Sequence, residues 1–367
     1  MHDGYSITEI VHGNPAPNNR VIVIQRNPTM TPCVLILGAA GRIGQVLALA
    51  FADAGWEVRA QARKPLPASL ASHPRVRPIR CDANDGAALG AAARGCTAII
   101  NALNPPYTEW DRLVLPLADA ALAAARSSGA LLMLPGNVYN FGRELPALLT
   151  PQTPERADTP KAGIRIELEA RLRAAATDGA GHPVDSVVIR AGDFFGGPGS
   201  GTWLDMALAS KLGKGRFLYP GNPNIAHAWA YLPDLTQTFV RVAALRAEQP
   251  AALRGHHRLH FAGHHLTGNA FKAALETVLG RPLRTSNLPW RFIRLASPFV
   301  PMWRELLTMR YLWERPHALD DAALRALIGD VPQTPLPQAL RAALGAQAGL
   351  AAIAAAAAVA ALAATAR

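Results

Sequence analysis

The spacing of apolar positions along the chain changes between two patterns. Residues 34–37 form a short continuous apolar run, and Ile43, Leu47, Ala50 and Ala54 then recur every three or four residues. A continuous apolar run is typical of a strand buried on both faces, and the second spacing is typical of an amphipathic helix. This region therefore predicts a buried strand, a turn, and a helix that packs back on the strand.

The same alternation continues through the first half of the chain. It predicts a doubly wound parallel sheet, an α/β fold with helices covering both faces. The expected strands span residues 56–62, 76–80, 97–101, 130–134 and 183–190. The expected helices span residues 85–94, 107–127 and 161–176. Ligands of such sheets bind beyond the carboxyl ends of the strands, so functional residues are expected there.

The turn after the first strand contains three glycines spaced three apart, Gly38, Gly41 and Gly44, with Arg42 and Ile43 between the last two. Glycine lets the backbone approach a pyrophosphate closely, and the following helix start offers free N–H groups and a partial positive charge. Because a strand precedes the turn and a helix follows it, the motif predicts a dinucleotide-binding site.

The residues after the second expected strand bear on the choice of cofactor. An acidic residue at this place binds ribose hydroxyls, whereas arginine accommodates a 2′-phosphate. The chain has Arg63 and Lys64 there and no competing acid, and Arg42 can add a second cationic contact. We therefore expect NADP(H) in preference to NAD(H), with Asp82 accepting a hydrogen bond from the adenine amino group or capping a helix.

The pattern becomes shorter and less regular after residue 190. It predicts a glycine-rich loop, a segment at 225–235, a strand at 258–261, a helix after Thr267, an aromatic-rich helical stretch at 290–313 and a helix at 320–329. We expect four regions: a disordered extension (1–29), a nucleotide-binding domain (30–190), a smaller substrate-facing subdomain with segments that return to the sheet (191–335), and an Ala-rich tail (336–367).

The two ends of the chain carry no strong targeting signal. Residues 1–29 are polar, without the apolar stretch of a secretory signal, and translation from Met30 is an alternative. The Ala-rich tail is long enough to span a bilayer, but alanine is only marginally apolar and aromatic anchors are missing. A docked helix or a low-complexity tail is preferred to a membrane anchor.

Composition narrows the partners. The formal net charge is +11, but the arginines are spread singly, without a basic run or an interleaved aromatic pattern, so a nucleic-acid partner is not expected. Cys33, Cys81 and Cys96 have no paired spacing and are interpreted as small buried apolar residues in a reducing, cytoplasmic compartment. Histidine pairs at 256–257 and 264–265 lack acidic or cysteine neighbours at ligand spacing, so no metal is assigned.

Five segments, taken in order, resemble the extended or atypical short-chain dehydrogenase/reductases, particularly their NAD-dependent epimerase/dehydratase group. They are the glycine turn at 38–44, Asp82, the strand end at 101–106, the loop at 137–142 and the segment at 190–196. The resemblance covers residues 32–235 and implies a Rossmann-type domain, with Asn101 and Asn104 near the cofactor. It also implies oxidoreduction or epimerisation at a carbonyl or carbinol carbon of a small molecule. The aromatic residues at 290–313 can form ordinary core or the face of a homodimer.

The chain departs from that family at the acid/base residues. Family members use a Tyr-x-x-x-Lys pair on the helix after the fifth strand and a serine near that strand's end. Alignment of the helix through Glu169 places Lys161 at the tyrosine position and Arg165 at the lysine position, and the serine position falls near Pro135. No tyrosine lies between Phe141 and Lys161. The usual proton relay is therefore absent.

Three interpretations of this departure remain open. In the first, Lys161 acts as an acid/base with a depressed pKa and Arg165 is a fixed cation for the ribose. In that case Asn137, Tyr139, Asn104 and Tyr107 also face the nicotinamide. In the second, the protein binds NADP(H) without catalysis, as a sensor or regulatory partner. In the third, Lys161 and Arg165 are solvated residues on an exposed helix face.

Three downstream residues are candidates for contact with substrate. Asp193 follows the strand at 183–190 and is expected to border the substrate crevice. His227 can supply a proton or a hydrogen bond because histidine titrates near neutral pH, although a structural role is the more common one. Trp229 can line an apolar pocket or belong to the core.

Overall fold

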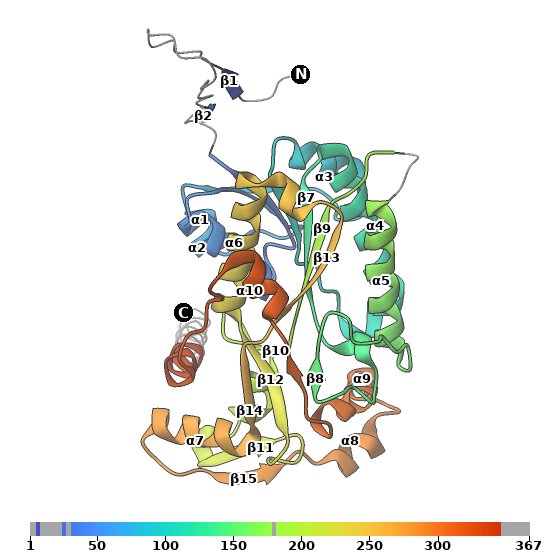
Figure 1. Cartoon of the computed structure of the whole chain (residues 1–367). Helices are drawn as coiled ribbons and strands as arrows, with labels where there is room; N and C mark the ends of the chain where they lie inside the picture. The colour runs from blue at the N-terminus through green and yellow to red at the C-terminus, as the bar shows by residue number, and fades with distance from the viewer. Residues whose placement is uncertain (1–4, 8–23, 27–30, 178–180, 346–367) are drawn as a thin grey trace, which may run out of the picture.

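The computed structural model describes residues 5–7, 24–26, 31–177 and 181–345. Its centre is a sheet of seven parallel strands (Figure 1). Across the sheet the strands follow the order β13 (His256–Phe261), β9 (Ser186–Ala191), β7 (Leu131–Gly136), β6 (Ala98–Asn101), β3 (Cys33–Leu37), β4 (Glu57–Gln61) and β5 (Val76–Ile79).

The strand order reverses between β3 and β6. From β3 the chain first builds outward through β4 and β5, then crosses to β6 and builds the other way. At such a reversal the helices following the two strands lie on opposite faces, which leaves a crevice at the carboxyl ends of the strands. The glycine turn directly follows β3 and therefore lies at this crevice.

Helices cover both faces of the sheet (Figure 1). One face packs against α3 (Gly86–Ala93), α4 (Trp110–Ser128) and α5 (Pro160–Ala176). The opposite face packs against α1 (Arg42–Asp53), α2 (Ala68–Ala71), α6 (Leu232–Glu248) and α10 (Ala322–Ile328).

The alternation of side chains along β3 explains why both layers form. Leu35 and Leu37 belong to the core under α4, whereas Val34 and Ile36 belong to the core under α1 and α6. Successive strand residues point to opposite faces, so an uninterrupted apolar run buries both. The continuous apolar pattern at 34–37 thus requires the two helical layers that the structure has.

A smaller lobe lies beyond the carboxyl ends of the central strands (Figure 1). Its strands form three small sheets: β10 (Asp193–Phe195), β12 (Ala226–Tyr231) and β14 (His264–Thr267); β11 (Arg216–Tyr219) and β15 (Arg284–Asn287); β8 (Leu148–Leu149) and β16 (Ala318–Leu319). Its helices are α7 (Gly268–Leu279), α8 (Trp290–Ala296) and α9 (Pro301–Thr308).

Short helical turns complete the described chain. They are η1 (Tyr107–Glu109), η2 (Tyr139–Phe141), the π-helical η3 (Leu204–Leu208), η4 (Leu212–Lys214), η5 (Pro250–Leu253) and η6 (Arg310–Trp313). A core of its own holds the small lobe together, in which the Phe271 ring contacts those of Phe195, Phe217 and Trp229.

The predicted fold class is confirmed, and the α/β elements before residue 190 lie where the pattern placed them. Beyond residue 190, α6, β13 and α10 return to the central sheet, as expected of some segments there. The 17-residue helix α6 was not predicted as a helix. The division into four regions stays a prediction.

The two chain ends are described only in part. Within residues 1–29, β1 (Tyr5–Ile7) pairs antiparallel with β2 (Ile24–Arg26), which the predicted disorder does not account for. Within the predicted tail, residues 336–345 are helical, and Ala339 and Leu340 are buried in the small lobe. The rest of the tail lies outside the described residues. No helix within the described ranges is long and apolar enough to cross a membrane.

The cysteines are buried or half-buried, as expected, but two of them meet. Cys33 begins β3 and Cys96 precedes β6, the neighbouring strand. Their sulfur atoms are 2.7 Å apart. The sequence spacing of 63 residues gave no sign of this contact, which arises from strand pairing.

Candidate functional site

The glycine turn has the geometry of a close backbone approach. Gly38 adopts a φ of +75°, which side-chain-bearing residues rarely adopt, and the Gly41 N–H donates to the Gly38 carbonyl at 2.9 Å. A Cβ at Gly44 would lie 2.2 Å from the Gly38 oxygen and 2.8 Å from the Ala39 Cα. Only glycine therefore lets α1 start this close to β3.

The first turn of α1 is open to a ligand. Its N-cap residue is Gly41, which has no side chain to cap the free N–H groups, and the first turn contains no acid. Ile43 packs against the core under α1 and anchors this turn. Unsatisfied N–H groups and the positive end of a helix bind anions, so these residues fit the pyrophosphate of a dinucleotide.

Gln61, the last residue of β4, connects the turn to the neighbouring strands. Its Oε1 accepts the Gly38 N–H at 3.0 Å, and its Nε2 donates to the Cys81 carbonyl at 2.8 Å. Its own carbonyl accepts the Ala39 N–H at 2.9 Å. Gln61 is almost completely buried, and the sequence analysis did not identify it. A polar residue ending an apolar strand was the available signal.

Arg63 and Asp82 lie near each other at the open edge of this site. Both side chains are exposed. Hydrogen bonds from the Asn84 backbone and side chain lower the pKa of Asp82, and the charge of Arg63 lowers it slightly further. Asp85, not Asp82, caps α3 by accepting the Ala88 N–H at 2.9 Å. The alternative capping role of Asp82 is therefore wrong.

Arg42 has a different partner from the expected phosphate. Its guanidinium donates to the Asp205 carboxylate at 2.6 Å and to the Gly196 carbonyl at 3.2 Å. Both partners belong to the segment after residue 190. In the structure Arg42 therefore joins the start of α1 to the small lobe.

Asn101 is the last residue of β6 and Asn104 follows the strand, at the strand-order reversal. Asn101 is buried, and its Oδ1 accepts the Leu103 N–H at 3.2 Å, which shapes the turn. A Cβ at Gly38 would lie 3.1 Å from Leu103 Cδ2, so this turn packs against the glycine turn. Asn104 is exposed.

Two tyrosine hydroxyls meet at the ends of β6 and β7. The Tyr107 and Tyr139 hydroxyl oxygens are 2.8 Å apart, and Asn137 orients Tyr139 by accepting its backbone N–H at 3.0 Å. Burial raises the pKa of both phenols, that of Tyr139 strongly, and the nearby Asp193 charge raises both further. Both phenols are therefore protonated near neutral pH, and the pair can donate one hydroxyl proton to a ligand.

Lys161 and Arg165 point into the protein beside these tyrosines. Lys161 is 3% exposed, forms an ion pair with Glu305 of α9, and donates to the Tyr107 carbonyl at 3.3 Å. The Arg165 guanidinium lies 4.8 Å from the Trp110 ring centre. Desolvation lowers its pKa, while the carboxylate of Glu169 opposes that shift. The interpretation that both are solvated residues on an exposed face is therefore wrong.

Asp193 and His227, predicted separately, form a pair. His227 Nε2 lies 2.7 Å from the Asp193 carboxylate, and Nδ1 lies 3.3 Å from the Leu312 carbonyl. Each ring nitrogen of His227 therefore has an oxygen within hydrogen-bond distance, one from a carboxylate and one from a backbone carbonyl. The His227 ring also stacks on Trp313, with centroids 4.4 Å apart. Trp229 lies in the core of the small lobe, so its interpretation as pocket lining is not supported.

The comparisons with known proteins agree with this geometry. Residues 38–158 match the model of a protein family described as NAD(P)H-binding. The chain carries an NAD(P)H-binding domain. A search among curated proteins found no similar sequence.

Several solved structures share the fold of most of this chain, including the NAD(P)H-binding domain. A UDP-glucose 4-epimerase from Stenotrophomonas maltophila, with bound NAD and formylated UDP-arabinopyranose, superposes with a TM-score of 0.69 at 14% identity, covering 88% of this chain and 99% of that one. The dTDP-glucose 4,6-dehydratase DesIV from Streptomyces venezuelae gives 0.64 at 18% identity, covering 86% and 96%. MoeE5, with UDP-glucuronic acid and NAD, gives 0.67 at 16% identity, covering 86% and 98%. These epimerase and dehydratase structures share the fold of this chain, a Rossmann-type parallel sheet with smaller C-terminal sheets.

A buried polar cluster supports the tyrosines of the NAD(P)H-binding domain from behind. Arg190 of β9 is fully buried and forms ion pairs with Glu155 and Glu169. Asn140, the residue after Tyr139, donates to Glu169 at 3.1 Å and to Glu155 at 3.2 Å. The sequence analysis assigned no role to this cluster. The sequence feature that could have indicated the cluster is Arg190, a charged residue directly after the apolar run 187–189.

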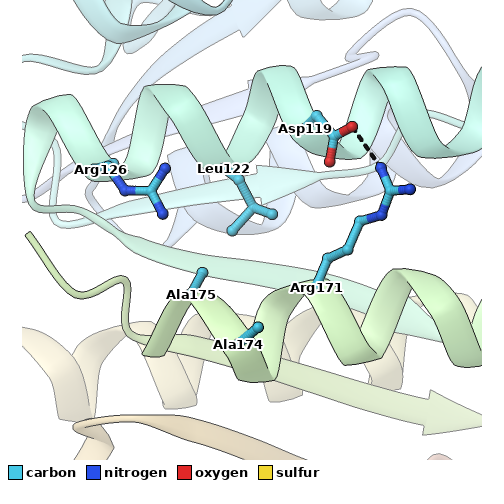
Figure 2. Close-up of a pocket in the computed structure, with 6 residues that line it drawn as sticks. All are labelled: Asp119, Leu122, Arg126, Arg171, Ala174 and Ala175. Atoms are coloured by element: carbon cyan, nitrogen blue, oxygen red, sulfur yellow. Dashed lines mark hydrogen bonds and ion pairs between the residues drawn. The ribbon is translucent and has the colours of Figure 1, made fainter. Parts of the chain in front are cut away.

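A surface groove lies away from these residues, between α4 and α5. Figure 2 shows Asp119 and Arg126 of α4 facing Arg171 and Ala175 of α5, with an Asp119–Arg171 ion pair of 2.6 Å. Its volume is about 460 Å³. It is formed by the C-terminal halves of two helices, which lead back to the amino ends of the next strands. It is therefore separate from the nucleotide crevice, which lies at the carboxyl ends.

The described part of the chain contains no group of three or more His, Cys, Asp or Glu side chains arranged to hold a metal ion.

Proposed function

We propose that the protein is an NADP(H)-dependent oxidoreductase or epimerase that acts at a carbonyl or carbinol carbon of a small molecule. The observation that carries this proposal is the Tyr107–Tyr139 hydroxyl pair. Tyr139 is buried and Tyr107 is half-buried, beyond the carboxyl ends of β6 and β7, on the sheet edge that carries the glycine turn. The cofactor, when bound, supplies or accepts the hydride.

Tyr139 is proposed as the proton donor to the oxygen of the reacting carbon. Its raised pKa keeps the proton in place until negative charge develops on a nearby oxygen. Tyr107 hydrogen-bonds to that hydroxyl and can pass on its own proton. The hydrogen-bonded Asp193–His227 pair, whose carboxylate charge acts on both phenols, is the proposed route by which the lost proton is replaced.

Lys161 and Arg165 receive different roles in this proposal. The Lys161 Nζ is already occupied by the Glu305 carboxylate and the Tyr107 carbonyl. We therefore assign it the positioning of Tyr107 through the carbonyl contact, in place of the acid/base role expected from the sequence. Arg165 remains the proposed fixed cation near the tyrosines, because its charge acts on the Tyr107 phenol.

The proposed preference for NADP(H) depends on the end of β4. Gln61 stands where the strand ends, and its amide is already occupied by the Gly38 N–H and by the Cys81 carbonyl, which follows β5. The next polar side chains, Arg63 and Lys64, are exposed cations. A guanidinium can bind a 2′-phosphate in two-pronged fashion, and no carboxylate is present at the strand end to repel it.

The test is NADPH oxidation by the purified full-length chain with a panel of aldehydes, ketones and nucleotide sugars. Nucleotide sugars head the panel because they are the compounds named with the structural neighbours. Tyr139→Phe should lower kcat by about 100-fold, the scale of a lost general acid, without changing the Kd for NADPH. Tyr231→Phe, which removes a phenol in the small lobe, is the matched control.

Two results would contradict the proposal. Turnover by Tyr139→Phe at the wild-type rate would remove Tyr139 from the mechanism. Tight NADPH binding without turnover across the panel would instead support the binding-only sensor.

A further inference from the structure

An exposed apolar surface covers the helical hairpin formed by α8 and α9. Phe292 is 59% exposed, Leu295 76%, Phe299 86% and Met302 40%. Phe292 and Leu295 lie one turn apart on α8, Phe299 lies in the connecting loop, and Met302 is in the first turn of α9. We call these four residues the hairpin surface. Isolated exposed apolar residues are ordinary, but four within eleven consecutive residues indicate an interaction site.

The hairpin itself is ordered and anchored at its base. Ile293 is buried, Phe292 packs edge-on against Trp303 with ring centroids 5.7 Å apart, and α9 holds Lys161 through Glu305. The exposed residues are therefore presented by a fixed scaffold, and α9 contacts η1, the turn that contains Tyr107.

Positive charge surrounds the hairpin surface. Residues 277–304 contain five arginines and no aspartate or glutamate. Arg291, Arg294 and Arg304 are exposed on α8 and α9, and none of them has an ion-pair partner among the residues that the structure describes. Glu305, the next acid along the chain, is turned inward to Lys161. The surface thus combines apolar tips with uncompensated cations.

We propose that the hairpin surface docks on an anionic lipid membrane. Apolar side chains that insert at the boundary between headgroups and acyl chains, flanked by arginines that contact lipid phosphates, are the chemistry of peripheral membrane binding. A second copy of the chain fits less well, because a two-fold contact would place the same unpaired arginines against one another. The proposed occupant is therefore a negatively charged bilayer surface.

The test is cosedimentation of the full-length protein with phosphatidylcholine vesicles, with and without phosphatidylglycerol. We expect binding at least about tenfold stronger to the anionic vesicles, and weaker at high salt. Leu295→Ser combined with Phe299→Ser, and separately Arg291→Gln with Arg294→Gln and Arg304→Gln, should each weaken binding about tenfold or more. Met206→Ser, at an exposed apolar residue outside the hairpin, is the matched control and should bind normally.

Vesicle binding and NADPH binding are separate readouts, so this inference and the proposed reaction can fail independently. All variants should keep the wild-type Kd for NADPH, which shows that they are folded. Absence of wild-type binding to anionic vesicles would overturn the inference, as would undiminished binding of the Leu295→Ser/Phe299→Ser variant. The inference would also be overturned if light scattering showed that the wild-type protein is a dimer and that only this variant is a monomer. The hairpin surface would then bind a second copy of the chain.

Discussion

The two ends of the nucleotide crevice are built in different ways. At the glycine-turn end, Gly38, Gly41 and Gly44 act through backbone, within seven residues of sequence. At the tyrosine end, side chains from separate segments meet: Tyr107 contacts Tyr139, and Lys161 contacts Glu305, which lies 144 residues further along. The first end is a local motif, whereas the second exists only when both lobes are assembled.

The two ends also differ in charge and burial. The glycine-turn end offers N–H groups and exposed cations to a ligand. The tyrosine end contains buried titratable groups that the protein itself must satisfy, including Lys161 and the Asp193–His227 pair. Buried charges are costly unless paired, so the tyrosine end should be the more sensitive to loss of a partner.

The largest expected effect is at the glycine-turn end. Gly44→Ala would place a Cβ 2.2 Å from the Gly38 oxygen, so the turn must move. We expect affinity for NADPH to fall more than about 100-fold, measured by fluorescence titration, because the backbone must lie against the pyrophosphate. Gly163→Ala, in a helix with open space around it, is the control and should bind normally. Equal binding by both variants would show that the turn is not the nucleotide site.

The next effect is at the tyrosine end. Glu305→Gln leaves the buried Lys161 ammonium without its carboxylate, and should lower the free energy of unfolding by about 3 kcal/mol in urea titrations. Lys161→Met should cost less, because it removes the buried charge itself. Glu314→Gln, which breaks an exposed pair with Arg310, is the control and should cost less than about 1 kcal/mol. If both glutamate variants lower the free energy of unfolding by the same amount, the Lys161–Glu305 pair contributes no more than an exposed ion pair.

A smaller effect distinguishes the cofactors. Arg63→Glu should weaken NADPH binding about 30-fold and leave NADH binding nearly unchanged, because the substitution puts a carboxylate where the 2′-phosphate is proposed to lie. Arg75→Glu, at an exposed site before β5, is the control. Equal losses for NADPH and NADH would count against the proposed preference.

The smallest effect is a pH dependence behind the tyrosine end. Burial lowers the pKa of His260 to about 4, helped by the nearby Arg190 charge. Between pH 4 and the ordinary pKa of histidine, the folded state therefore binds fewer protons than the unfolded chain. The free energy of unfolding is unaffected by this group above the ordinary histidine pKa, and it falls as the pH drops towards 4. His260→Gln should reduce this slope by about 1 kcal/mol per pH unit. The exposed His265→Gln should leave the slope unchanged; if both variants give the same slope, His260 is not its source.

The pH dependence of turnover is expected at the alkaline end, whereas that of stability is expected in acid. The raised pKa of the Tyr139 phenol keeps it protonated through neutral pH. Carbonyl reduction should therefore show no loss from this group until well above the ordinary tyrosine value of about 10. A loss centred near pH 7 that Tyr139→Phe abolishes would contradict the protonation state we assign.

The sequence predicted much of the fold because its elements in the first half follow regular spacings. The apolar run before Gly38 and the helical spacing after it fall on β3 and α1, and the apolar run at 187–189 falls in β9. The helix α6 was missed because it starts directly after β12, so a strand and a helix read as one apolar segment. Length and tertiary packing, not local composition, separate the two.

The candidate site was predicted residue by residue but not as an arrangement. Tyr107, Tyr139 and Asp193 were selected for lying beyond a strand end, and His227 was selected because histidine titrates near neutral pH. Which of them pair depends on how the small lobe meets the sheet, so neither the hydroxyl contact nor the histidine–carboxylate contact could be derived from spacing. Gln61 escaped notice because its function is to satisfy buried backbone groups, for which glutamine has no distinctive pattern.

The sequence by itself determined the parallel sheet, the glycine turn and the absence of the usual Tyr-x-x-x-Lys pair, because these depend on short-range periodicity and residue identity. Only the tertiary structure decided that Lys161 is paired with Glu305, that Arg42 holds the small lobe, and that Tyr139 has a hydroxyl partner. The physical reason is range. Backbone conformation and apolar spacing act over a few residues, whereas burial, ion pairing and pKa depend on which distant segments the folded chain brings into contact.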